Sequence, residues 1–168
     1  MSIATKRIGP ADHGKRMRLA DFEHADVLEG YIYELGRGVI VVSDVPDRTH
    51  FAVVDALRAL LYAYRAQRPD VIQHIGAGSD CKLLTQAFES ERHPDAVVYM
   101  TAPPDEEEYD DPWRDWIPEL VVEVVSASST RRDYEEKPEE YLAIGIREYW
   151  IIDPRKQTML ALRRRAGV

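Results

Sequence analysis

The sequence "PELVVEVVSASS", residues 118–129, contains an almost unbroken apolar run with one carboxylate inside it. Between Leu120 and Val125, the one residue that is not apolar is Glu123. Continuous runs of Val and Leu are typical of strands that are covered on both faces of a sheet. The stretch therefore predicts a central strand over 119–125, and it raises the question of how the protein accommodates a charge there.

Alternation along a strand places Glu123 on the same face as Val121 and Val125, while Val122 and Val124 point to the other face. An isolated carboxylate at such a position either costs several kcal/mol or becomes protonated. Three arrangements would relieve this cost: an ion pair with a basic residue such as an arginine, a raised pKa, or a bound cation. The stretch by itself leaves all three open.

A second acid favours the bound cation. Asp95 follows Pro94 at the head of an apolar stretch, "AVVYM", which predicts a strand over 96–100. Two acids on neighbouring strands, neither next to a cation in the sequence, form a plausible site for a hard cation. Carboxylate oxygens are the ligands that Mg²⁺ and Mn²⁺ prefer.

Length, charge and cysteine content limit the possible classes of protein. The 168 residues predict one domain over 1–168, with 1–15 as a loose N-terminal segment. The net charge of −8 does not favour binding to phosphates by bulk charge alone. The single cysteine, Cys81, excludes an internal disulfide and suits a reducing cytoplasm. With no secretory signal and no apolar run near the roughly 20 residues of a membrane span, we expect a cytoplasmic protein without membrane contact.

Periodicity and turn residues predict a mixed order of helices and strands, which indicates an α/β (α+β) fold. Helices are expected over 15–28, over 49–67 with Thr49 as N-cap, and within 131–144. The acidic segment 102–116 is expected to be a solvated loop. Strands are expected over 31–35 and 38–43 as a hairpin, and over 71–76, 81–85, 96–100, 119–125, 148–153 and 158–164.

Several stretches resemble the Uma2 family, also called DUF820, of the PD-(D/E)XK nuclease superfamily. They are "PD" at 94–95, "PELVVEVVS" at 118–126 and the pattern "D…EK…Y…GI.EYWIID" through 133–153. The hairpin "EGYIYELGRGVIVV" and His50 at the start of the next helix fit as well, so that the resemblance runs from about residue 20 to about 160. The resemblance implies a restriction-endonuclease-like fold with a mixed central β-sheet flanked by helices.

The resemblance also implies roles for four residues. Asp95 and Glu123 would hold a divalent ion, Mg²⁺ or Mn²⁺, and Glu34 would be an additional metal-binding acid. The superfamily usually places a lysine two residues after the Glu, where this chain has Val125, and the resemblance transfers that role to Lys137. The implied function is a Mg²⁺-dependent endonuclease that hydrolyses phosphodiester bonds of nucleic acid, with DNA as the expected partner and a homodimer as the expected assembly.

Two departures from the family pattern leave alternatives open. "SAS" at 126–128 stands where the family has "SPS", and Pro138 directly follows Lys137. Proline disfavours helical geometry in the residue before it and interrupts a helix interior, so either a kink or a new helix start is expected. The alternatives are a catalytically silent nucleic-acid-binding or regulatory module on the same fold, and a Glu123 that is ion-paired without any metal. Without a Gly-rich phosphate loop, no nucleotide cofactor is expected.

Overall fold

The computed structural model describes residues 6–44, 47–78, 81–104 and 116–165. It divides into two compact units, Met1–Val45 with Leu84–Arg92 and Pro46–Leu83 with His93–Val168. The single domain expected over 1–168 stays a prediction. Most of the loop predicted over 102–116, and residues 1–5 of the loose segment, lie outside the described residues.

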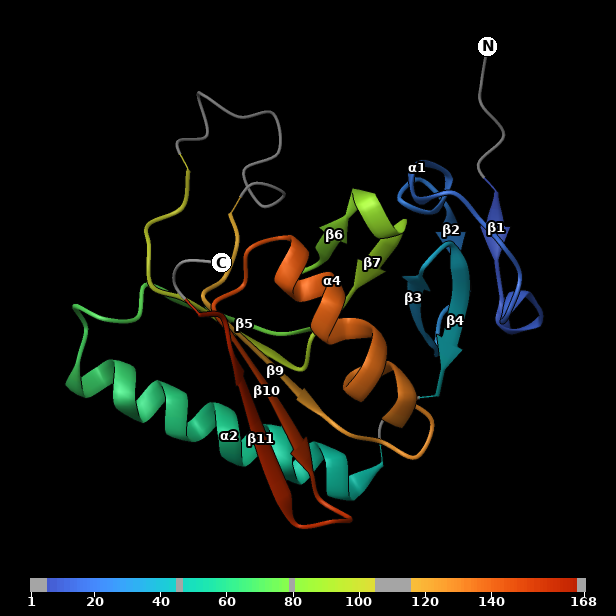
Figure 1. Cartoon of the computed structure of the whole chain (residues 1–168). Helices are drawn as coiled ribbons and strands as arrows, with labels where there is room; N and C mark the ends of the chain where they lie inside the picture. Colours follow the sequence, from blue (N-terminus) through green and yellow to red (C-terminus); the bar gives the residue numbers. More distant parts are fainter. Residues whose placement is uncertain (1–5, 45–46, 79–80, 105–115, 166–168) are drawn as a thin grey trace. The chain divides into compact units, whose positions relative to one another are not determined.

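The second unit is built on a five-stranded sheet with the order β11-β10-β9-β8-β5 (Figure 1). β9 and β10 run parallel, whereas the other neighbouring pairs are antiparallel. The mixed sheet that the sequence predicted is therefore confirmed. Its strands are β5 (His74–Gly76), β8 (Ala96–Tyr99), β9 (Leu120–Val124), β10 (Glu148–Asp153) and β11 (Thr158–Arg163).

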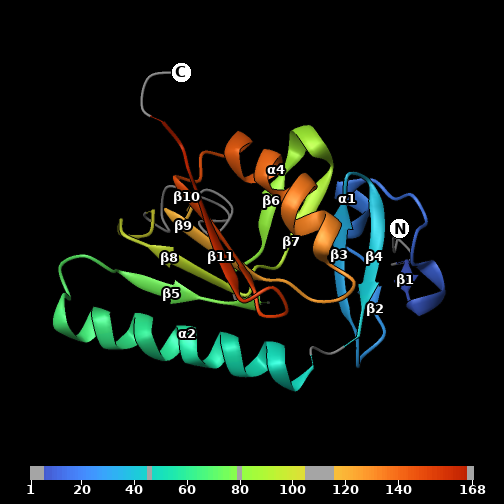
Figure 2. The same cartoon turned by 60° about the horizontal axis from the view of Figure 1, so that its bottom comes forward.

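Helices lie on both faces of this sheet (Figure 2). On one face, Leu120 and Val122 of β9 pack with side chains of α2 (Arg48–Gln67). On the other face, Val121 and Val125 pack with Tyr141 of α4 (Lys137–Ala143). Every residue of β9 is buried, so the prediction of a strand covered on both faces is confirmed.

The start of α2 differs from the prediction. The N-cap is Asp47 rather than Thr49, because the Asp47 carboxylate accepts a hydrogen bond from the backbone N–H of His50 at 2.9 Å. Phe51 and Leu60 are 67% and 71% exposed, whereas Leu57 and Leu61 pack against the sheet. None of the helices in the described ranges combines the length and the apolar character needed to cross a bilayer.

The helix that carries Lys137 contains a π-helical turn, η4 (Arg132–Glu136), directly before α4. The backbone N–H of Lys137 donates to the carbonyl of Arg132, five residues earlier. Pro138 follows in the first turn of α4. A proline lacks an N–H and crowds the carbonyl four residues before it, so a wider turn at this point lets the chain stay helical. Pro138 thus neither ends the helix nor starts a separate one.

The first unit contains a four-stranded sheet with the order β4-β3-β7-β6. The predicted hairpin is confirmed, because β3 and β4 pair antiparallel. The helix predicted over 15–28 is wrong in length, because the observed helix α1 is shorter. Near the predicted start, Arg16 forms a bridge with Val39, and near the predicted end, β2 pairs with β1. The elements are β1 (Arg7–Ile8), η1 (Pro10–Asp12), α1 (Leu19–Phe22), β2 (Asp26–Val27), β3 (Ile32–Gly36), β4 (Val39–Ser43), β6 (Leu83–Thr85), η3 (Gln86–Phe88) and β7 (Ser90–Arg92).

The turn between β10 and β11 is held by a buried carboxylate. Oδ1 of Asp153 accepts from the backbone N–H groups of Arg155 and Lys156, both at 3.1 Å. Oδ2 accepts from the Tyr134 hydroxyl at 3.3 Å and lies 3.3 Å from Lys156 Nζ. Burial raises the pKa of Asp153, but the hydrogen bonds and charge of Lys156 and the Tyr134 hydroxyl together hold it below its ordinary value.

We predict that Asp153 contributes to acid sensitivity. A carboxylate with a lowered folded-state pKa stabilises the fold above its unfolded pKa, and the contribution disappears as the pH falls through the folded value. Asp153→Asn should therefore be less stable than wild type near neutral pH, with a difference that narrows below about pH 4. Urea unfolding across this range measures the difference. Asp70→Asn, which removes the carboxylate of an exposed ion pair with Arg68, is the control. A difference in stability between wild type and Asp153→Asn that does not change with pH would contradict the prediction.

Candidate active site

The two predicted acids are brought together by the pairing of β8 with β9. Asp95 directly precedes β8, whose register pairs Ala96 with Val122 of β9. Oδ2 of Asp95 also accepts a hydrogen bond from the backbone N–H of Val124 at 2.7 Å, which fixes the carboxylate against β9.

Lys137 compensates the charge that Glu123 places inside β9. Its Nζ lies 2.8 Å from Oε1 of Glu123 and 2.9 Å from Oδ1 of Asp133. The three side chains are between 1% and 5% exposed. Asp133 and Lys137 are four residues apart and so share one face of their helix. The buried charge of Glu123 is therefore compensated by a lysine, where an arginine was the named alternative.

Hydroxyl groups complete the surroundings of both carboxylates. Tyr141 donates to Oε1 of Glu123 at 2.6 Å, and Ser129 donates to Oδ2 of Asp133 at 2.5 Å. Tyr149 donates to the backbone carbonyl of Asp133 at 2.9 Å, and its ring meets that of Tyr141 edge to face. The two tyrosines therefore contribute hydrogen bonds as well as packing. Asp133 begins the pattern that carries the family resemblance, but no site role was predicted for it.

His50 contacts the other acid. Its Nε2 lies 3.2 Å from Oδ2 of Asp95, and Asp47 holds its backbone through the N-cap bond. Burial lowers the pKa of His50, but the hydrogen bond and charge of Asp95, with smaller contributions from Asp47 and the Val124 backbone, raise it above its ordinary value overall. The sequence indicated only a histidine near the start of a helix, because 45 residues separate it from Asp95.

Glu34 lies in β3 of the first unit and is buried. Its Oε2 is 3.6 Å from Nη1 of Arg92, whose side chain is fully buried. The guanidinium also packs on Gly36, where a Cβ atom would come within 2.8 Å of Nη1. The structure thus gives Glu34 an ion pair within its own unit, and its role as a metal ligand stays a prediction.

The donor set at the β8–β9 pair suits a hard cation. Within the described part of the chain, no group of three or more His, Cys, Asp or Glu side chains is placed to hold a metal ion. Mg²⁺, however, is usually bound through only one or two carboxylates and keeps several waters. Asp95 and Glu123 are carboxylates, and the hydrogen bond from the Val124 N–H holds Asp95 beside the residue that follows Glu123, so the residue types present fit such an ion.

The mixed sheet and the helices on its two faces define an α+β protein with a restriction-endonuclease-like fold. The chain belongs to the Uma2 family, whose model is described as "Putative restriction endonuclease" and matches residues 19–168. The chain is similar to a solved structure described as "a putative nuclease belonging to DUF820 from Anabaena variabilis ATCC 29413". The two share 20% identity and a TM-score of 0.71 over 90% of this chain and 82% of that one, which shows a common fold. No curated protein matches the chain.

We predict that the lysine shared by two carboxylates is a major stabilising contact. Lys137→Met leaves Glu123 and Asp133 buried without their cation, which should lower the free energy of unfolding by about 3–5 kcal/mol. Urea unfolding followed by circular dichroism measures this loss.

Lys15→Met is the matched control. Lys15 Nζ lies 2.8 Å from Oδ1 of Asp12, the same distance as in the buried pair, but its side chain is 62% exposed. Exposed ion pairs contribute little, so this substitution should have a far smaller effect. Similar losses in the two variants would contradict the importance of burial.

Proposed function

We propose that this protein is a divalent-metal-dependent endonuclease that hydrolyses phosphodiester bonds of nucleic acid, with DNA as the substrate. The observation that carries the proposal is the Lys137 ammonium, 2.8 Å from the carboxylate of Glu123 on the strand that pairs with Asp95. Asp95 and Glu123 are the proposed ligands of Mg²⁺ or Mn²⁺, and a role of Glu34 as an additional acid stays a prediction from the family resemblance.

The chemistry of phosphodiester hydrolysis explains why these residue types belong together. A bound divalent cation supplies positive charge to the phosphate and makes an attacking water more acidic. Lys137 adds a second positive charge beside Glu123, where it would orient the water and stabilise the charge that develops on the phosphate. Asp133 and Tyr141 hold the Lys137–Glu123 pair in one geometry, so that little reorganisation is needed during the reaction.

The position of Lys137 supports a catalytic role in spite of Pro138. The π-helical turn before Pro138 keeps the lysine on the face of the helix that meets β9. The alternative is a catalytically silent nucleic-acid-binding module. Two observations favour this alternative: the Lys137 ammonium contacts two carboxylates, and the lysine is 3% exposed. The ammonium would have to leave one of these carboxylates to reach a substrate.

The proposal includes a cytoplasmic location and a homodimer. Cys81 is buried and, as the single cysteine, forms no internal disulfide, which suits a reducing compartment. Related nucleases often pair to address two strands, and sedimentation of the purified chain would test the dimer.

We predict that Mn²⁺ binding depends on both acids. Isothermal titration of wild type with Mn²⁺ should give a saturable heat that Asp95→Asn and Glu123→Gln remove, because each loses one of the two anionic ligands. Asp70→Asn, which removes an exposed carboxylate of the same kind, should leave the heat unchanged. Equal heats in all four proteins would remove the metal site and leave Glu123 as an ion-paired structural residue.

We predict further that cleavage depends on the acids and the lysine. With Mg²⁺ or Mn²⁺, wild type should cut plasmid or single-stranded DNA, and Asp95→Asn and Lys137→Ala should be slower by at least about 100-fold, the usual effect of losing one charge-stabilising group. Circular dichroism confirms that each variant is folded. Products that are identical in wild type and both variants would point to a contaminating nuclease, and no cleavage by folded, Mn²⁺-bound wild type would favour the silent module.

A further inference from the structure

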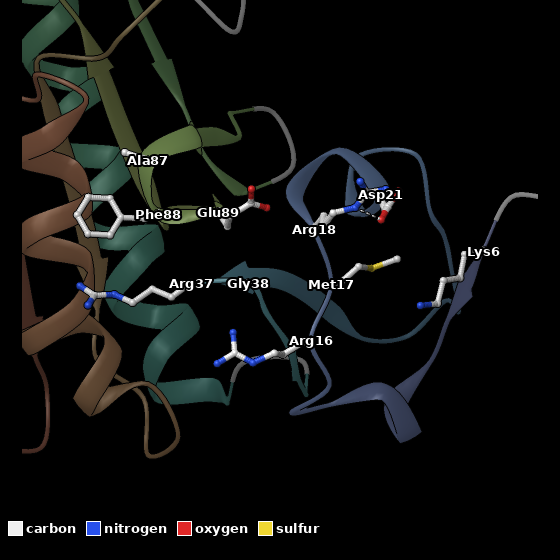
Figure 3. A pocket seen from close by; sticks show the side chains of 10 residues that line it. All are labelled: Lys6, Arg16, Met17, Arg18, Asp21, Arg37, Gly38, Ala87, Phe88 and Glu89. Carbon is white, nitrogen blue, oxygen red and sulfur yellow. Dashed lines mark hydrogen bonds and ion pairs between the residues drawn. The ribbon is translucent and has the colours of Figure 1, made fainter.

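An open hollow of about 620 Å³ lies within the first unit, among α1, the β3–β4 turn and η3 (Figure 3). Four of its lining residues are cationic, and we refer to it as the basic hollow. In the view of Figure 3, Lys6 lies at one side and Arg37 with Phe88 at the other, with Arg16 and Arg18 between them. Positive side chains spread along a hollow suit a chain of phosphates better than a single anion.

The acids of the basic hollow already have partners. Asp21 forms a two-pronged ion pair with Arg18, at 2.8 and 2.9 Å. The carboxylate of Glu89 accepts the backbone N–H of Leu19 at 2.5 Å. Arg16 and Lys6, in contrast, are exposed and make no ion pair with any described residue. The hollow therefore offers positive charge that the described part of the protein does not neutralise.

The backbone around the basic hollow is cross-linked, which fixes the positions of its side chains. The N–H of Met17 donates to the carbonyl of Gly38 at 2.9 Å, and the N–H of Gly38 donates to the carbonyl of Glu89 at 2.8 Å. The N–H of Arg37 donates to the Ser90 hydroxyl at 2.8 Å. Three segments of the chain thus share one framework, and a ligand would meet a site that needs little ordering.

Arg37 occupies a strained position in this framework. Arg37 and Gly38 join β3 to β4 with φ angles of 51° and 73°, a two-residue turn in which Asn or Gly is favoured at the first position. The guanidinium carbon of Arg37 lies 5.1 Å from the centre of the Phe88 ring. Arginine in a left-handed conformation is uncommon, and positions of this kind cluster at functional sites, which supports a role of this side chain in binding.

We propose that the basic hollow binds a single-stranded nucleic acid. Arg16 and Arg37 contact successive phosphates, and Phe88 provides a ring on which a base stacks. A positive groove combined with an aromatic ring is the combination that binds single strands with little sequence preference. This binding requires neither Asp95 nor Glu123, so it is separate from the proposed hydrolysis.

The test measures binding of fluorescent oligothymidylate, about 20 nucleotides long, by anisotropy in EDTA between about 50 and 200 mM salt. The double variant Arg16→Gln/Arg37→Asn removes two cations. For single strands, each phosphate contact contributes about 0.7 to the slope of log K against log salt, so the slope should fall by about 1.4 and affinity at 0.1 M salt by about 25-fold. Lys15→Gln is the matched control, because Lys15 neighbours Arg16 but pairs with Asp12 outside the hollow.

Two further measurements separate this inference from unfolding and from the proposed hydrolysis. Asn adopts the left-handed conformation at position 37 more readily than Arg does. The melting temperature of the Arg37→Asn variant should therefore equal or exceed that of wild type, while its binding weakens. Asp95→Asn should bind the oligonucleotide as wild type does. Equal affinity and salt slope in wild type and the double variant would overturn the inference. So would competition by inorganic phosphate as effective as that by the oligonucleotide, or wild-type binding confined to duplex DNA.

Discussion

The second unit depends on the buried ammonium of Lys137, which lies between the carboxylates of Glu123 and Asp133. Burying three charges is unfavourable unless each is compensated, so the three side chains must be buried together. Glu123 belongs to β9 and the other two to the helix above it, and the contact therefore fixes how that helix lies on the sheet. The hydroxyls of Tyr141 and Ser129 supply the remaining hydrogen bonds and leave little freedom for another arrangement.

The same contact links the stability of the fold to its proposed chemistry. Glu123 is held by Lys137 from one side, and Asp95 on the neighbouring strand is held by the Val124 N–H and by His50. Acids that are fixed before any ligand arrives need little ordering when one binds, which is the general advantage of a preorganised site. The rigidity that would favour the proposed hydrolysis also confines the lysine, so the proposed activity would require a balance between the two.

The parts of this arrangement that follow from short-range patterns were predictable from the sequence. Alternation along β9 gave the face on which Glu123 lies, and the Pro94–Asp95 step placed the second acid at the start of the strand that pairs with β9. Family resemblance indicated Lys137, which no local pattern marks. Long-range contacts were not predictable: the choice of lysine over arginine as partner of Glu123, and the His50–Asp95 contact, depend on the packing of separate helices against the sheet. The N-cap of α2 was predicted wrongly because Asp47 and Thr49 are both favourable N-cap residues, and the helix is capped by Asp47.

The π-helical turn at Arg132–Glu136 has a consequence for how this helix tolerates change. Such a turn carries one more residue than the α-helical turn it replaces, and each residue of an α-helix rotates the chain by about 100°. Loss of one residue from this segment would turn it into an α-helical turn and leave Asp133 three residues before Lys137, a spacing that still places both side chains on one face of the helix. Because the wider turn accommodates Pro138, such a deletion should be tolerated best together with replacement of that proline.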